Sequence, residues 1–208
     1  MKPLLCLLTG LLISNLSYAK IPSLYETQLD LSLDKLVVEV NGYKVPTRDA
    51  FHGWMLINQA SDKVFEIRDY FKTNGVKGEL PQYLVLLQGT DWRLNQKSVF
   101  VLPNKKNWDN MIRTVKLIEQ QIIPVIGDLV PVSGERSEEY NAISGGAKSS
   151  KHLNFCAMDL VPEKTIERKL LHQKLLEIHR QIGPSHKMGL GLYSGLRFHI
   201  DTCGFRRW

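Results

Sequence analysis

The sequence predicts an α+β fold, with a small antiparallel sheet and flanking helices. Short apolar segments of strand length are interleaved with two long segments whose apolar residues recur at helical spacing. Their order lacks the regular strand–helix–strand alternation of a doubly wound parallel sheet. Hydrophobic residues make up 43% of the 208 residues and charged residues 23%, a composition that supports a real core and excludes a disordered or low-complexity chain.

Residues 1–19 have the pattern of a secretory signal rather than of a folded domain. Lys2 precedes an apolar stretch of about 11 residues, and the small residues Ser17 and Ala19 follow that stretch. The stretch is too short to form a stable membrane anchor. We therefore expect cleavage after Ala19 and export to the periplasm or the extracellular space.

The rest of the chain divides into two parts. Residues 20–102 form an N-terminal extension to which the sequence assigns no role, and residues 103–208 form the domain that carries the motifs. The formal net charge of +6 suits an anionic partner such as a cell wall. No recognition-helix or zinc-finger spacing is present, which argues against binding of nucleic acid, and nothing in the sequence indicates the oligomeric state.

The N-terminal extension begins with a hairpin signal. Two β-branched runs in residues 36–45 flank Asn41 and Gly42, the residue pair that favours a two-residue turn. A helix is predicted over residues 61–74, with Ser61 as its cap and a glycine after it as its stop. Residues 80–102 have a mixed pattern with two short apolar runs.

The clearest helix covers residues 107–123, where large apolar residues recur at i, i+3, i+4 and i+7. Pro124 and Gly127 are expected to end it. A short strand is predicted over residues 129–133, followed by a polar, glycine- and serine-rich segment over residues 134–152.

The last third of the chain contains a second long helix and a closing pair of strands. The helix covers residues 165–182, with Thr165 as a possible cap and Gly183 as the stop. Residues 189–193 and 197–202 are expected to be strands or a hairpin.

Three residues in these segments have the chemistry of a metal site. Asp159 lies within an apolar strand at residues 156–161, where a charge costs free energy unless it is paired or bound to a metal. With His152 and His199 it offers two imidazoles and one carboxylate, and a catalytic zinc site takes three protein ligands and leaves a position for water. Spacing alone does not decide against ordinary polar residues, because such spacings are common by chance.

Strand alternation adds two residues to this group. In an extended segment Arg197, His199 and Asp201 lie on one face, while Phe198 and Ile200 lie on the other.

The order of the motifs resembles a known family. The motifs are Ser133-Gly134-Glu135-Arg136, Tyr140-Asn141, Gly145-Gly146-Ala147, Ser150-x-His152-x6-Asp159, Gly189-x-Gly191-x-Tyr193, Phe198-His199-Ile200-Asp201-Thr202 and a terminal Arg-Arg-Trp. This order looks like the D-alanyl-D-alanine carboxypeptidase-type zinc peptidases, which share a fold with lysostaphin and the hedgehog signalling domain. It resembles most closely their peptidoglycan-directed bacterial branch, over about residues 108–208.

The resemblance implies a role for each matching residue. His152, Asp159 and His199 match the ligands of one zinc ion per chain. Arg136 matches an arginine that holds substrate or the developing oxyanion, which suits the two donors of a fixed guanidinium.

Three further residues are expected to contact the substrate. Ser150 matches a serine of the family that contacts substrate or the metal ligands. Tyr193 belongs to the Gly-x-Gly-x-Tyr motif, and Arg197 is expected to act as an additional electrophile, since it cannot lose its proton in a useful pH range.

The sequence also departs from the family pattern. Phe155 stands where members usually have glycine, so it is expected to alter the turn or narrow the cleft. Leu196 stands at the position of a frequent acidic base, and Arg197 at the position of an alternative histidine. Asp201 is therefore the first candidate for the general base, with the equal alternative that it orients a ligand imidazole.

The cysteines leave three interpretations open. Cys6 lies in the signal, so Cys156 and Cys203 are left in an oxidising compartment, which favours a disulfide. Strand alternation directs the two side chains to opposite faces, which disfavours one. On balance the sequence favours two unpaired thiols over a disulfide, and zinc ligation least.

These observations predict an exported zinc metallopeptidase that hydrolyses peptide bonds next to D-amino acids in peptidoglycan stem peptides or cross-links. The alternative is a zinc-bearing module that binds the wall or a partner without catalysis, suggested by Leu196 and Phe155. No nucleotide-binding fingerprint is present.

Overall fold

A computed structural model describes residues 33–91 and 97–208 of the chain. The expected signal at residues 1–19 lies outside the described residues. The larger helical elements are α2 (Arg48–Ile57), α3 (Ser61–Thr73), α5 (Trp108–Leu117), α7 (Glu138–Ile143) and α8 (Arg168–His186). The shorter ones are α1 (Leu33–Leu36), η1 (Gln82–Leu86), η2 (Lys105–Asn107), the π-helical turn η3 (Ile118–Ile122), α6 (Ile123–Ile126) and η4 (Lys151–Asn154).

The fold is α+β, as predicted, and its centre is a five-stranded sheet of order β3-β4-β6-β5-β7. Neighbouring strands are antiparallel except β5 and β7, which are parallel. The strands are β3 (Leu129–Ser133), β4 (Ala157–Pro162), β5 (Gly189–Leu192), β6 (Phe198–Asp201) and β7 (Arg206–Arg207). The predictions for β3 to β6 are confirmed, whereas β7 is too short to have a pattern in the sequence.

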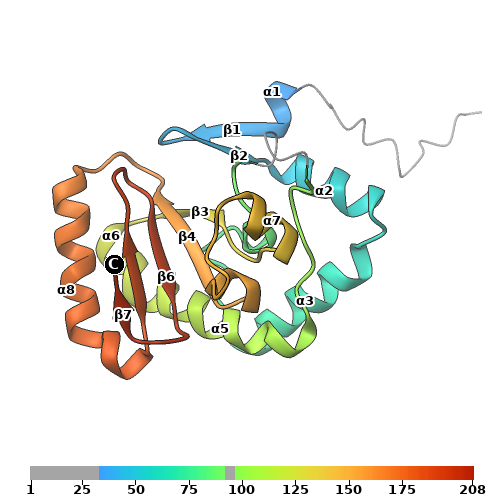
Figure 1. Ribbon diagram of the computed structural model, residues 1–208. Coiled ribbons are helices and arrows are strands. Elements are labelled where there is room, and N and C mark those ends of the chain that lie inside the picture. Colours follow the sequence, from blue (N-terminus) through green and yellow to red (C-terminus); the bar gives the residue numbers. More distant parts are fainter. Residues whose placement is uncertain (1–32, 92–96) are drawn as a thin grey trace, which may run out of the picture.

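Alternation along the strands separates a core face from a cleft face. Met158 and Ile200 are fully buried in the hydrophobic core, with helices α5 and α8 close to the sheet (Figure 1). Asp159 and His199, each next to one of these residues, form a register pair on the opposite face of β4 and β6. The sheet thus presents two chemically active side chains side by side.

The predicted N-terminal hairpin is confirmed. Strands β1 (Val37–Val40) and β2 (Tyr43–Pro46) pair in antiparallel register and form a separate sheet. Asn41 and Gly42 form the turn with φ values of 47° and 85°. Positive φ at both turn residues is the geometry that this residue pair favours.

The helix predicted over residues 61–74 is confirmed as α3, but its predicted cap is wrong. Ser61 is the first helical residue, and Ala60 occupies the cap position without a side-chain hydrogen bond. Sequence reasoning missed α2, whose cap is the side chain of Thr47 accepting from the amide of Ala50 at 3.4 Å.

The helix predicted over residues 107–123 continues beyond Pro124, which therefore does not end it. Pro124 lacks an amide hydrogen and its ring crowds the preceding turn. The π-helical turn η3 widens the helix just before this proline, and the chain stays helical through α6. Gly127, with φ of 100°, ends the element.

The predicted ends of the second long helix are also wrong. Helix α8 starts at Arg168, and Thr165 instead donates a hydrogen bond to Asn41 Oδ1 at 3.2 Å. Gly183 stays helical, and its lack of a side chain makes room for the ring of Phe205, which would lie 2.8 Å from a Cβ. The helix ends at Lys187, whose backbone adopts the left-handed conformation.

Cys156 and Cys203 form a disulfide with a Cα–Cα distance of 6.3 Å, so the preference for unpaired thiols is wrong. Cys156 precedes β4 and Cys203 follows β6, so neither lies in the regular strand that the alternation argument assumed. Ala157 pairs with Asp201 in the register, which brings the two flanking cysteines together.

One hydrophobic core runs from Val45 in β2 to Ile200 in β6 and joins residues on both sides of the predicted boundary at residues 102 and 103. The boundary itself stays a prediction. In the described part of the chain, none of the helices has the length and apolar character needed to cross a membrane.

Candidate functional site

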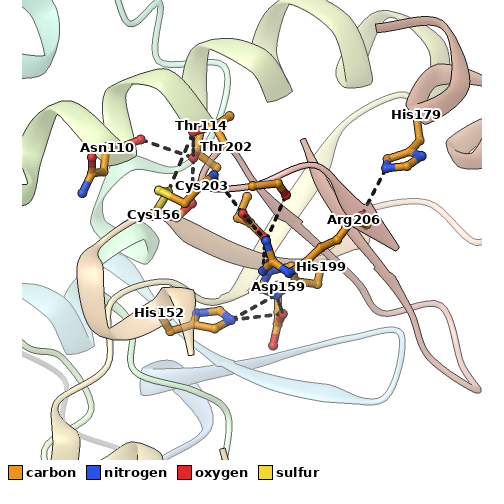
Figure 2. A network of polar contacts seen from close by, with 12 residues as sticks. Asn110, Thr114, His152, Cys156, Asp159, His179, His199, Thr202, Cys203 and Arg206 are labelled. Carbon is orange, nitrogen blue, oxygen red and sulfur yellow. Dashed lines mark hydrogen bonds and ion pairs between the residues drawn. A yellow bond between two sulfur atoms is a disulfide. The ribbon is translucent and has the colours of Figure 1, made fainter. Parts of the chain in front are cut away.

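The structure brings His152, Asp159 and His199 together on the cleft face of the sheet (Figure 2). His199 Nδ1 lies 3.0 Å from Asp159 Oδ1 and 3.3 Å from His152 Nε2. His152 Nε2 lies 3.3 Å from Asp159 Oδ1. All three residues are buried, so three ligand atoms converge on one point with little access to bulk solvent.

The tautomer of His152 leaves its Nε2 free for a metal. His152 Nδ1 donates a hydrogen bond to the carbonyl oxygen of Gly134 at 2.6 Å, because a carbonyl oxygen only accepts. Gly134 comes close to the short helix η1 here, since a Cβ at this position would stand 2.0 Å from the carbonyl oxygen of Val85. Because Gly134 has no side chain, its carbonyl oxygen can reach the position where it accepts the hydrogen bond from His152.

His199 is oriented from behind by Asp201. His199 Nε2 donates to Asp201 Oδ2 at 3.0 Å, which leaves Nδ1 to face Asp159. Arg206 donates to both carboxylate oxygens, at 2.7 and 3.1 Å, and the amide of Cys203 donates to Oδ1 at 2.9 Å. A carboxylate that holds the second nitrogen of an imidazole is the usual support of a metal-binding histidine.

Gly189 makes room for this support. A Cβ at Gly189 would stand 2.1 Å from Asp201 Oδ2, and one at Gly191 would stand 2.7 Å from the indole of Trp208. The Gly-x-Gly motif of the sequence is therefore explained by the side chains of Asp201 and Trp208, which lie over β5.

The electrostatics of His152 and Asp159 suit metal binding. Burial lowers the pKa of His152, so its imidazole is neutral. Burial alone raises the pKa of Asp159, but His152 and His199 hold it well below its usual range. Burial lowers the pKa of His199, but hydrogen bonds to Asp159 and Asp201 outweigh this effect and raise it.

The donor set and its spacing fit zinc. Zinc binds imidazole nitrogen and carboxylate oxygen at roughly 2.0–2.1 Å in tetrahedral geometry, so two ligand atoms are separated by about 3.3 Å. The three distances between ligand atoms are 3.0, 3.3 and 3.3 Å. Three protein ligands leave the fourth position to water or substrate, which is the pattern of a catalytic rather than a structural zinc site.

Arg136, the residue expected to hold substrate or the oxyanion, lies beside this group. Its Nη2 is 3.2 Å from Asp159 Oδ2, and its Nε donates to Ser133 Oγ at 2.9 Å and to the carbonyl oxygen of Gln88 at 3.1 Å. These bonds fix the guanidinium plane at the edge of the site. Gln88 comes from the N-terminal extension. Sequence reasoning missed it because the residues around it belong to no recognisable motif.

The three ligands open into a cleft of about 640 Å³. Ser150, Tyr193 and Arg197 line this cleft together with Arg136, so the structure brings the predicted substrate-contacting residues to one place. Asp201 does not line it and is fully buried. The other carboxylate that lines the cleft among the described residues, besides Asp159, belongs to Asp91, which the sequence did not suggest.

Phe155 keeps the left-handed backbone that favours glycine in the turn after His152, and it does not line the cleft. Its backbone is left-handed, with φ of 49° and ψ of 40°, the conformation for which glycine is the least strained residue. Its ring is fully buried and lies 6.2 Å from the ring of Phe71 in α3. The bulky side chain therefore packs the site loop onto the N-terminal extension.

Comparison with known proteins agrees with this geometry. Residues 100–201 match the model of the family described as Peptidase M15. Searches among the curated proteins and among the solved structures found no match.

Proposed function

Since residues 100–201 place this chain in the peptidase M15 family, we propose that it is an exported zinc peptidase that hydrolyses peptide bonds next to D-amino acids in peptidoglycan stem peptides or cross-links. The observation that carries the proposal is the convergence of His152, Asp159 and His199 in one cleft at distances that fit zinc. The net charge of +6 and the signal pattern at residues 1–19 support an anionic, extracytoplasmic substrate.

His152, Asp159 and His199 would hold a zinc ion, which would supply Lewis-acid chemistry to polarise a scissile carbonyl and to activate water. Arg136 would donate hydrogen bonds to the carbonyl oxygen as negative charge develops on it. Its guanidinium is held by Gln88 and Ser133, so it needs little reorganisation to do this.

The proton of the attacking water needs an acceptor. Asp201 is a poor one, because its carboxylate already accepts from His199, Arg206 and Cys203 and does not face the cleft. Burial alone raises the pKa of Asp201, but the hydrogen bond from His199, with those from Cys203 and Arg206, lowers it below its usual value. We therefore assign Asp201 the orienting role and favour Asp91, which lines the cleft, as the acceptor.

The proposal is tested on purified peptidoglycan. We expect zinc-loaded protein to release D-alanine or to convert cross-linked dimers to monomers, as measured by mass analysis of muropeptides, and a chelator to abolish this change. His152→Ala should be inactive, while His52→Ala, which changes an exposed histidine in α2, should retain activity.

Two results would contradict the proposal. Unchanged muropeptides from folded, zinc-loaded protein would favour the non-catalytic wall-binding alternative, and hydrolysis that persists in His152→Ala would exclude this site as its source.

A further inference from the structure

Arg197 is the one cleft arginine, among the residues that the structure describes, for which no salt bridge or side-chain hydrogen bond is found. Arg136 contacts Asp159, and Arg206 contacts Asp201, whereas no carboxylate of the described residues lies within ion-pair distance of Arg197. Its Nε is buried without a hydrogen-bond partner. A partly buried guanidinium without an anion is costly, so this arrangement points to an anion that comes from outside the chain.

Two aromatic rings position this guanidinium. The carbon at its centre lies 4.2 Å from the ring centroid of Tyr193 and 6.0 Å from that of Tyr43. Burial raises the pKa of Tyr193 to about 12, so its phenol stays neutral and does not compete as an anion. Stacking against rings fixes the plane of the guanidinium while leaving its edge free to donate.

Tyr43 comes from the N-terminal hairpin, outside the segment that matches the family. The hairpin is tied to the end of β4, because Asn41 Nδ2 donates to the carbonyl oxygen of Pro162 at 2.6 Å. In Figure 1 the β1–β2 hairpin lies near the end of the sheet at which β4 leads into the loop before α8. The extension therefore delivers Tyr43 to the rim of the cleft.

We propose that Arg197, which lies against Tyr193 and near Tyr43, binds a substrate carboxylate, and that the N-terminal hairpin thereby takes part in substrate selection. The inference rests on the proposed function for the identity of the substrate. A guanidinium edge with two free donors matches a carboxylate in shape and charge. Asp159, the nearby acid in the cleft, is committed to His152, His199 and Arg136.

The spacing limits which carboxylate this is. Arg197 precedes the ligand His199 by two residues, about 6.6 Å along an extended strand. Successive residues of an extended peptide are about 3.3–3.6 Å apart. The bound carboxylate therefore lies within a few residues of the cleaved bond, either at the free C-terminus or on the glutamyl residue of a stem peptide.

Three synthetic stem peptides that end in D-alanyl-D-alanine separate these sources. One has both carboxylates free, one has an amidated C-terminus, and one has an amidated glutamyl α-carboxylate. We expect zinc-loaded wild type to lose about 10–100-fold in kcat/KM on one of the two amidated peptides, the range of a charge-assisted hydrogen bond. Arg197→Gln should lose a similar factor on the free peptide, mostly in KM, and should no longer distinguish it from the amidated one.

Substitutions at Tyr43 test whether the hairpin contributes to substrate binding. Tyr43→Leu should raise KM for the recognised peptide several-fold with little change in kcat, and Tyr43→Phe, which keeps the ring, should restore it. Arg197→Lys, which keeps the charge without the planar fork, should fall between wild type and Arg197→Gln. The matched control is Arg180→Gln, since Arg180 is exposed on α8, 77% accessible in its side chain.

Binding of the same peptides by calorimetry keeps this test separate from catalysis. Carboxylate-dependent binding that is lost in Arg197→Gln supports the subsite even if no peptide is hydrolysed, a result that would overturn the peptidase proposal alone. Binding and hydrolysis that respond equally to amidation in wild type and Arg197→Gln would overturn the subsite.

Discussion

Two buried carboxylates near the site have opposite electrostatic environments. Asp201 accepts from His199, Arg206 and the Cys203 amide, so its charge is fully compensated. Glu135, only 6% exposed, has one oxygen without any hydrogen-bond partner. Burial therefore raises the pKa of Glu135 to about 8, although the amide of Phe155 counteracts it. One acid stays ionised to support the site, and the other stays protonated near neutral pH.

Asp201→Asn should lower zinc affinity about 10–100-fold, because the oriented Nε2–H of His199 loses its charged acceptor. Excess zinc should restore most of the hydrolysis. Competition with a chromogenic chelator measures the affinity, and Asp69→Asn, an exposed acid in α3, is the control. Unchanged affinity with a loss of activity that zinc does not restore would instead make Asp201 the general base.

Glu135 should make the free energy of unfolding depend on pH. Between about pH 4.5 and 8 the folded protein keeps this proton while the unfolded chain has lost it, so stability falls as pH rises through that window. The loss should be about 5 kcal/mol over the whole window, and Glu135→Gln should flatten the profile. Urea unfolding at several pH values tests this, and parallel profiles for wild type and variant would refute the assignment.

At the scale of elements, β4 and β6 are braced on the side away from the cleft. The disulfide joins the residue before β4 to the second residue after β6. Thr114 in α5 donates to the carbonyl oxygen of Cys156 at 2.8 Å and lies 2.9 Å from the hydroxyl of Thr202 (Figure 2). The strands that carry Asp159 and His199 are therefore held in register at their ends.

Replacing both cysteines, Cys156→Ala with Cys203→Ala, should reduce the free energy of unfolding by about 4 kcal/mol, since the bridge closes a long loop. The two cysteines are 47 residues apart. Denaturant titration of wild type with and without reductant is the measurement, and reduced wild type should match the double variant. Equal midpoints in all three samples would show that the bridge does not form.

Element patterns were predictable where apolar periodicity was long or alternation was clean. Strands β3 to β6, α3 and the turn at Asn41 and Gly42 follow from such local signals. The C-terminal end of α8 was not predictable from Gly183. This glycine makes room for Phe205, which approaches it only in the folded chain, and it does not stop the helix. The disulfide was missed because its cysteines lie just outside the regular strands, where the alternation of side chains no longer applies.

At the scale of the whole molecule, the N-terminal extension builds part of the site. Gln88 holds Arg136, Phe71 packs on Phe155, and Tyr43 lies beside Arg197. The convergence of His152, Asp159 and His199 was predictable, because the ordered motifs that contain them resemble those of a known family. The supporting residues were not, because their role depends on contacts across more than 40 residues of chain, such as that between Gln88 and Arg136.

The most direct test of the central claim is a zinc titration of metal-free protein, followed by hydrolysis of a stem peptide. Activity should rise in proportion to added zinc and reach its plateau at one zinc ion per chain, and His199→Ala should neither bind this zinc nor gain activity. Activity that is independent of zinc, or a full zinc complement in His199→Ala, would show that these residues are not a catalytic zinc site.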